Sequence, residues 1–229
     1  MLQAWARGKH RDRREYEDEI VSAVFGPLQY FPWDTVTTWL CGFDRRLGSP
    51  SRYTGCEVIL WPNLATNGRC EPDILFNLRT ANSKRVILMI EAKWNSPQGT
   101  DQLSSQFKTV SARHGSDIEI LHVYLTRRSE SMFEMLGETQ PARGHRLVNL
   151  TWMQAFGGHD ASFISSGLEA WHKDVVAFLS RLGESPFRGF GAMRLWSTPS
   201  APARFFSSDI EWRLDQERAT HPPKFFNAT

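Results

Sequence analysis

Residues 71–93 read E-P-D-I-L-F-N-L-R-T-A-N-S-K-R-V-I-L-M-I-E-A-K. Two strongly apolar runs flank a short polar turn at 81–84, a pattern that is typical of a β-hairpin. In an antiparallel pair of strands, the beginning of the first strand lies beside the end of the second. We therefore expect Asp73, at the start of the first strand, to meet Glu91, at the end of the second.

The second strand of this hairpin has two chemically different faces, because side chains alternate along a strand. One face carries Arg85, Ile87, Met89, Glu91 and Lys93, and the other carries Val86, Leu88, Ile90 and Ala92. Two carboxylates that converge at about 4–6 Å repel each other unless a cation lies between them. Oxygen ligands of this kind suit Mg²⁺ or Mn²⁺, and a lysine beside the metal can position the water that attacks a phosphodiester.

The order Pro72-Asp73, apolar strand, Glu91-Ala92-Lys93 resembles the PD-(D/E)xK nuclease superfamily, which includes restriction endonucleases. The resemblance implies an α/β fold with a restriction-endonuclease-like core, in which a mixed central β-sheet is flanked by α-helices. It also implies that Asp73, Glu91 and the Ala92 carbonyl hold Mg²⁺ or Mn²⁺. Lys93 would then orient or activate the attacking water. A surface hairpin whose terminal charges face water is the alternative, but it does not explain why these charges gather at one end.

A helix is predicted from about Arg13 to Gly26, where Gly26-Pro27 ends it. Its apolar stripe comprises Tyr16, Ile20, Val21, Val24 and Phe25. On a helical wheel Glu17 falls near the middle of this stripe and Glu19 falls outside it, and a carboxylate on the core face needs a partner. In the resembled superfamily a first helix often supplies one more acidic residue to the metal site. Glu17 is therefore the candidate and Glu19 the second choice, while an ion pair with an arginine is the structural alternative for Glu17.

A second helix is predicted to begin near Thr100, after the turn at 96–99. Gln102 and Gln106 lie four positions apart and so share one face of this helix. The resemblance implies that a polar residue of this helix, often Gln, contacts DNA or a metal-bound water. Gln102 is the better candidate because Leu103 follows it, and a solvated helix face is the equally weighted alternative.

The remaining pattern predicts three more strands and one more helix. The strands span 56–61, 118–126 and 147–152, and the helix spans 168–182 with Gly183 at its end. Their order extends the hairpin into a mixed sheet flanked by helices. The pattern from 29 to 55 is weak. Arg127 and Arg128 follow a strand and could approach phosphates, although the ends of strands are often charged in any case.

Composition indicates one enzyme-sized globular domain. The 229 residues include 41% hydrophobic and 23% charged residues, which are ordinary globular values. We expect a nuclease-like domain over 1–195 and a C-terminal extension or tail over 196–229. The formal net charge is only +2, but a basic cluster that could contact phosphates occupies Arg7, Lys9, His10, Arg11, Arg13 and Arg14. A solvated N-terminal extension is the equally weighted alternative for this cluster.

The sequence also bears on location. No stretch approaches the roughly 18 apolar residues of a membrane span, and no apolar signal core follows the basic N-terminus. A cytoplasmic protein without a membrane anchor is therefore expected.

The three cysteines are Cys41, Cys56 and Cys70, and their spacing fits no zinc motif, so reduced thiols are expected.

Together these features predict a metal-dependent endonuclease that hydrolyses phosphodiester bonds of double-stranded DNA. The resemblance implies a place in a restriction, anti-phage defence or mobile-element system. It implies partner proteins that supply target specificity, and a homodimer is one assembly that such enzymes use. The alternative is a catalytically silent member of the fold that binds DNA or a protein partner. The intact Asp73, Glu91 and Lys93 argue against this alternative, and an RNase is the third interpretation.

Overall fold

The computed structural model describes most of the chain up to residue 184. The described residues are 17–64, 70–96, 98–99, 101–115, 118–137, 141–157, 163–164 and 167–184. All of them lie within Met1–Phe187, the first of two units into which the chain divides. The basic N-terminal cluster and the predicted tail at 196–229 lie outside the described residues. Within the described part, no helix is both long and apolar enough to cross a membrane.

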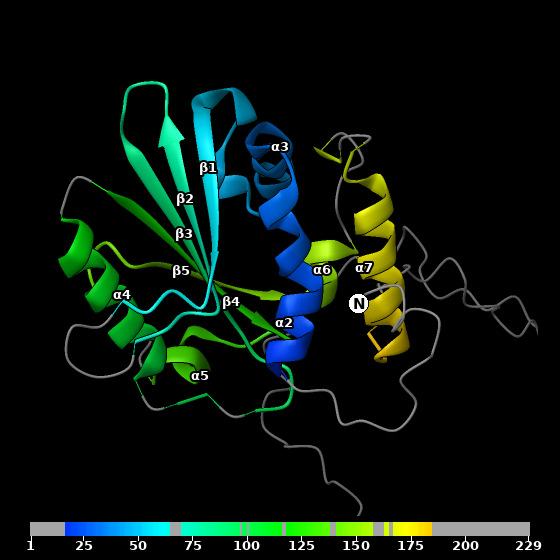
Figure 1. Ribbon diagram of the computed structural model, residues 1–229. Helices are drawn as coiled ribbons and strands as arrows, with labels where there is room; N and C mark the ends of the chain where they lie inside the picture. The colour runs from blue at the N-terminus through cyan, green and yellow to red at the C-terminus, as the bar shows by residue number, and fades with distance from the viewer. Residues whose placement is uncertain are drawn as a thin grey trace, which may run out of the picture. The chain divides into compact units, whose positions relative to one another are not determined.

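A five-stranded mixed sheet with the strand order β1-β2-β3-β4-β5 forms the centre of the fold (Figure 1). The strands are β1 (Tyr53–Leu60), β2 (Ile74–Thr80), β3 (Arg85–Ala92), β4 (Glu119–Thr126) and β5 (Arg146–Thr151). The pairs β1–β2 and β2–β3 are antiparallel, whereas the pairs β3–β4 and β4–β5 are parallel. The prediction of an α/β fold in which a mixed sheet is flanked by helices is confirmed.

The register of the β2–β3 hairpin matches the prediction. Ile74 lies opposite Ile90, and Arg79 lies opposite Arg85. Each step back along β2 is matched by one step forward along β3. The next pair towards the open end of the hairpin, beyond Ile74 and Ile90, is therefore Asp73 and Glu91. Residues directly opposite each other have Cβ atoms about 4.5–5.5 Å apart. The hairpin therefore brings the two carboxylates together.

Helices cover both faces of the sheet (Figure 1). One face packs against α2 (Glu17–Phe25), α3 (Trp33–Phe43), α6 (Trp152–Phe156) and α7 (Glu169–Arg181), and the other against α4 (Gln102–His114) and α5 (Met132–Leu136). The alternation of β3 agrees with this arrangement. Leu88 and Ile90 belong to the core beneath the first group, whereas Ile87 and Met89 pack with residues of α4.

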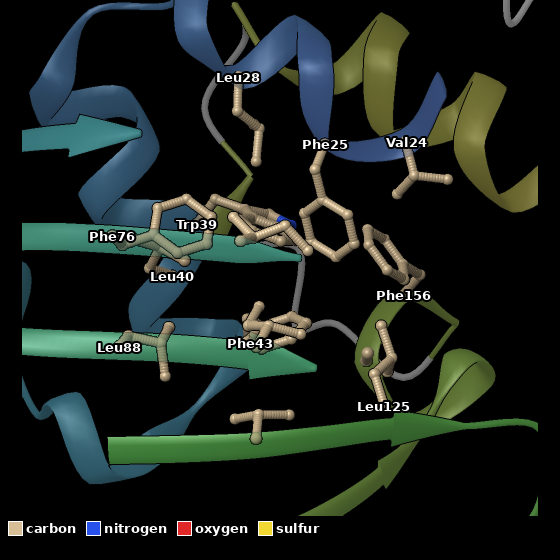
Figure 2. Close-up of a cluster of buried hydrophobic side chains, with 14 of the residues drawn as sticks. Val24, Phe25, Leu28, Trp39, Leu40, Phe43, Phe76, Leu88, Leu125 and Phe156 are labelled. Carbon is tan, nitrogen blue, oxygen red and sulfur yellow. The ribbon is translucent and has the colours of Figure 1, made fainter. Parts of the chain in front are cut away.

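An aromatic cluster fixes the helices on the first face (Figure 2). The ring of Trp39 lies 6.4 Å from that of Phe25 and 5.6 Å from that of Phe156, measured between centroids. All three side chains are fully buried, and aromatic pairs at such separations stabilise a core beyond the area that they bury. Because Phe25 ends α2, this cluster fixes the helix whose first described residue is Glu17.

Several element ends differ from the prediction, the largest difference on a strand being that β1 begins at Tyr53 rather than at Cys56. Trp152 begins α6 rather than ending β5, because Thr151 caps that helix: its hydroxyl accepts the N–H of Gln154, whose side chain accepts the N–H of Thr151. Helix α4 has its N-cap at Asp101, one residue beyond the expected cap.

The end of α7 follows the prediction. Gly183 adopts φ +92°, and its N–H donates to the carbonyl of Ser180. The N–H of Glu184 donates to the carbonyl of Leu179. These two bonds form a Schellman motif, which favours glycine because its left-handed residue has no Cβ to clash.

A buried histidine pair lies between the sheet and α4. Nδ1 of His122, in β4, is 3.0 Å from Nε2 of His145, just before β5, so one imidazole donates to the other. The His145 ring also stacks on Phe107, with the ring centroids 4.2 Å apart. Burial, and then the positive charge of Arg46, lower the pKa of His145 to about 4. Burial likewise lowers the pKa of His122 well below its usual value.

This pair predicts a loss of stability in mild acid. Histidine in an unfolded chain has a pKa near 6.5. Below that pH the unfolded chain therefore binds protons at His122 and His145, whereas in the folded protein these side chains stay neutral. The free energy of unfolding is therefore unaffected by these groups above pH 6.5 and decreases as the pH falls towards 4. For His145 alone the decrease is about 3 kcal/mol. Urea denaturation between pH 7.5 and 4.5 measures it. His145→Gln should flatten the dependence, and equal slopes for the two proteins would contradict the account.

Candidate active site

A cleft of about 450 Å³ lies at the open end of the β2–β3 hairpin. Its walls comprise Glu17, Asp18, Trp61, Cys70, Glu71, Asp73, Glu91, Lys93, Gln102, Ser105 and Gln106. All the predicted site side chains, Asp73, Glu91, Lys93, Glu17 and Gln102, are among them. Glu19, the second choice on the first helix, does not line the cleft.

A larger groove of about 860 Å³ lies at the opposite end of β3. It is lined by basic side chains, including Arg52, Lys84 and Arg85, together with Glu119. Glu119 forms ion pairs with Arg52 and Arg146. This groove lacks the paired carboxylates of the smaller cleft, which is therefore the better candidate for chemistry.

Asp73 immediately precedes β2 and is held by backbone groups. Its Oδ2 atom accepts the N–H of Ala92 at 2.7 Å, and its carbonyl accepts the N–H of Trp61 at 2.9 Å. Only 8% of Asp73 is exposed. Burial, and then the negative charge of Glu91, raise the pKa of Asp73 well above its usual range. The N–H and C=O of one strand residue point to the same side, so the Ala92 carbonyl also faces Asp73.

Glu91 ends β3 and accepts hydrogen bonds on both oxygens. Oε1 accepts the Nζ of Lys93 at 2.7 Å and the Nε2 of Gln102 at 2.5 Å, and Oε2 accepts the Nε2 of Gln106 at 2.6 Å. Glu91 is 1% exposed, and burial raises the pKa of its carboxyl although Lys93 and Gln106 oppose this. Gln106 was not selected from the sequence, although its spacing from Gln102 was the available signal.

Lys93 lies between two carboxylates. Its Nζ atom is 2.7 Å from Glu91 and 3.1 Å from Glu17. Burial by itself lowers the pKa of Lys93, but the charges of Glu91 and Glu17 outweigh it and raise that pKa above the usual value. Lys93 is therefore a cationic hydrogen-bond donor rather than a base. The backbone of Lys93 is also fixed: its N–H donates to the carbonyl of Leu125, and its carbonyl accepts the indole N–H of Trp152.

Glu17 ties helix α2 to the segment that follows β3. Its Oε1 atom accepts the ammonium of Lys93. Its Oε2 atom accepts the N–H of Trp94 at 2.8 Å and the hydroxyl of Ser96. The partner of this carboxylate is thus a lysine and not the arginine of the structural alternative. These contacts favour a role in positioning Lys93, and the role of Glu17 as a metal ligand stays a prediction.

The oxygen donors of the cleft fit a hard divalent cation. Asp73, Glu91 and the Ala92 carbonyl offer the ligand type that Mg²⁺ and Mn²⁺ prefer. A carboxylate has about four lone-pair positions, of which the contacts of Glu91 occupy three. In the part of the chain that the structure describes, no group of three or more His, Cys, Asp or Glu side chains is arranged to hold a metal. A cation here would therefore rely on two carboxylates, one carbonyl and water.

Comparison with known proteins leaves the function to be argued from this geometry. Neither a protein-family model nor a curated protein matches the sequence. Among solved structures, the chain is similar to the MspJI restriction endonuclease in complex with a 27-mer oligonucleotide, with 15% sequence identity and a TM-score of 0.32. The likeness covers 82% of this chain and 35% of that one, so this chain spans about a third of that protein's length.

Proposed function

We propose that this protein is a metal-dependent DNA endonuclease of the PD-(D/E)xK type. The observation that carries the proposal is the convergence of Asp73, Glu91 and Lys93 at one end of a single hairpin. Burial raises the pKa of both carboxyl groups, and the negative charge of Glu91 also raises that of Asp73. A divalent cation between the two groups would favour their ionised forms and relieve the repulsion between them. A surface hairpin with solvated charges would not bury these groups.

Each residue of the cleft has a defined part in this proposal. Asp73, Glu91 and the Ala92 carbonyl hold Mg²⁺ or Mn²⁺, which supplies Lewis-acid stabilisation of charge on the phosphate. The Lys93 ammonium donates a hydrogen bond to the attacking water or to a phosphate oxygen, where negative charge grows in the transition state. Gln102 and Gln106 fix the carboxylate of Glu91 by their amide N–H groups.

Contacts to the DNA backbone extend beside the cleft. Arg128 is exposed and lines a neighbouring groove that also contains Lys93, so its guanidinium can reach a phosphate next to the one that is cut. Arg127 instead pairs with Glu184 at 2.6 Å and lies over the ring of Trp94. Of the two arginines predicted to approach phosphates, Arg128 is therefore the better candidate.

Glu17→Gln tests whether Glu17 positions Lys93 or binds the metal. The substitution keeps the side-chain shape but weakens the charge-assisted bonds to Lys93 and Trp94. We expect kcat to fall about 10–100-fold, with the concentration of Mg²⁺ at half-maximal rate unchanged. A metal titration of the cleavage rate checks this. A large shift in the Mg²⁺ requirement would instead assign Glu17 to the metal.

The proposal is tested by incubating the full chain with supercoiled plasmid, linear duplex DNA and single-stranded RNA. Each substrate is run with Mg²⁺, with Mn²⁺ and with EDTA. Nicking or linearisation of the plasmid that needs the metal supports an endonuclease, whereas cleavage of the RNA alone would assign an RNase. A folded chain that binds duplex DNA and cuts nothing would favour the catalytically silent alternative. The defence or mobile-element context, the partner proteins and the homodimer stay predictions.

A further inference from the structure

Trp61 follows β1, lines the cleft and has an unusual backbone conformation. Its φ is +47°, in the left-handed region that bulky L-residues rarely adopt. Three non-glycine residues of the described part have a positive φ, and the other two, Ser83 and Asp101, lie in a turn and at a helix N-cap. The N–H of Trp61 donates to the carbonyl of Asp73, so the strained residue is tied directly to the predicted metal ligand.

The side chain of Trp61 has a second unusual property. Its indole Nε1 is buried and has no hydrogen-bond partner among the described residues. Trp152 and Trp171, by contrast, donate their indole N–H groups to the carbonyls of Lys93 and Val24. A buried N–H without an acceptor is destabilising. Backbone strain of this kind concentrates at functional sites, where the surrounding structure holds it in place.

The donors that contact the carboxylates of the cleft are partly engaged. Gln102 and Gln106 donate to Glu91, and the Lys93 ammonium donates to Glu91 and Glu17. A nucleic-acid strand that enters the cleft brings phosphate oxygens, which are strong acceptors. The indole N–H of Trp61 can donate to such an oxygen without breaking a bond that holds a carboxylate in place.

We propose that Trp61 is a substrate-contacting residue whose indole N–H donates to a phosphate oxygen of the nucleic-acid strand in the cleft. This inference rests on the proposed nuclease function. Because Nε1 is buried in the structure, this contact requires the half-buried ring to rotate so that its N–H faces the strand. The left-handed backbone at Trp61 places the ring at this wall, beside Asp73. The contact holds the strand next to the predicted metal ligands and adds no positive charge to the site.

The experiment compares Trp61→Phe, which keeps an aromatic ring and removes the donor, with Trp33→Phe as the matched control. Trp33 is 43% exposed and lies outside the cleft lining. Affinity for a fluorescent DNA duplex is measured by anisotropy in Ca²⁺, and cleavage is then measured in Mg²⁺. We expect Trp61→Phe to weaken binding and raise KM by about tenfold or more. The value of kcat should stay near that of the wild type, as should the melting temperature. Trp33→Phe should match the wild type throughout.

Equal affinities for the wild type and Trp61→Phe, beside normal cleavage, would overturn the role of Trp61 and leave the nuclease standing. A wild-type chain that neither binds nor cuts nucleic acid overturns both. If the variant does not fold, wild-type protein labelled with ¹⁵N-tryptophan provides the readout. The indole N–H resonance of Trp61, assigned from its connectivities, should move downfield when duplex is added. A resonance that stays in place contradicts the contact.

Discussion

Asp73→Asn and Glu91→Gln are each expected to reduce the rate of metal-dependent DNA cleavage by about 10³-fold or more. Each change removes one anionic ligand from a site that has only two carboxylates and one carbonyl to hold the cation. Loss of the metal's charge stabilisation costs several kcal/mol in the transition state, and about 4 kcal/mol corresponds to a factor of 10³. Single-turnover cleavage of supercoiled plasmid at saturating Mg²⁺ measures the loss.

Asp73→Asn should leave the fold intact, because the amide preserves the shape of the side chain and one acceptor atom. An amide oxygen at position 73 can still accept the N–H of Ala92, which now bonds Asp73 at 2.7 Å. Asp73→Asn also removes one of two buried like charges, so the resistance of this protein to urea in the absence of metal should stay the same or increase. Glu91→Gln replaces one of two acceptor oxygens by an NH2 group that faces a donor. Glu91→Gln also removes an ion-pair partner of Lys93, so that protein should be less resistant to urea. An Asp73→Asn protein that cuts within tenfold of the wild-type rate would show that Asp73 is not a metal ligand.

Lys93→Met is expected to lower cleavage by about 10²–10⁴-fold while duplex binding in Ca²⁺ changes little. The substitution removes the donor that lies between Glu91 and Glu17, and with it the group placed to orient the water. Both carboxylates then lose their cation, so the apo protein should be less stable by about 3 kcal/mol. Cleavage, anisotropy and urea denaturation of the same preparation separate these effects.

Lys93→Arg is the matched control for charge. It keeps a cation between Glu91 and Glu17 and should recover most of the lost stability. A planar guanidinium cannot reproduce the position of an ammonium, so cleavage should stay well below the wild-type rate. Full activity of the Lys93→Arg protein would reduce Lys93 to a structural ion pair.

The pairing in the hairpin could be predicted because it depends on local patterns. A polar turn between two apolar runs fixes the register, and the period of two then places Asp73 opposite Glu91 and Lys93 on the face of Glu91. The period of 3.6 likewise identified Glu17, rather than Glu19, as the acidic residue on the buried side of its helix. In the structure Glu17 contacts Lys93, Trp94 and Ser96.

Features that depend on distant parts of the chain could not be predicted. Helix α3 reads W-D-T-V-T-T-W-L-C-G-F, which is rich in residues of low helix propensity. It forms because Trp39, Leu40 and Phe43 pack into the aromatic core, and no local pattern reports that burial. The pairing of His122 with His145 and the left-handed backbone of Trp61 also arise from tertiary contacts.

The most direct test of the metal-dependent nuclease is the rate at which the full chain nicks supercoiled plasmid in Mg²⁺, compared with the rate for Asp73→Asn. The proposed function predicts nicking by the wild type that stops in EDTA and falls to background in Asp73→Asn, although both proteins unfold at similar urea concentrations. Nicking that persists in EDTA, or equally in both proteins, would contradict a metal-dependent site built on Asp73 and Glu91.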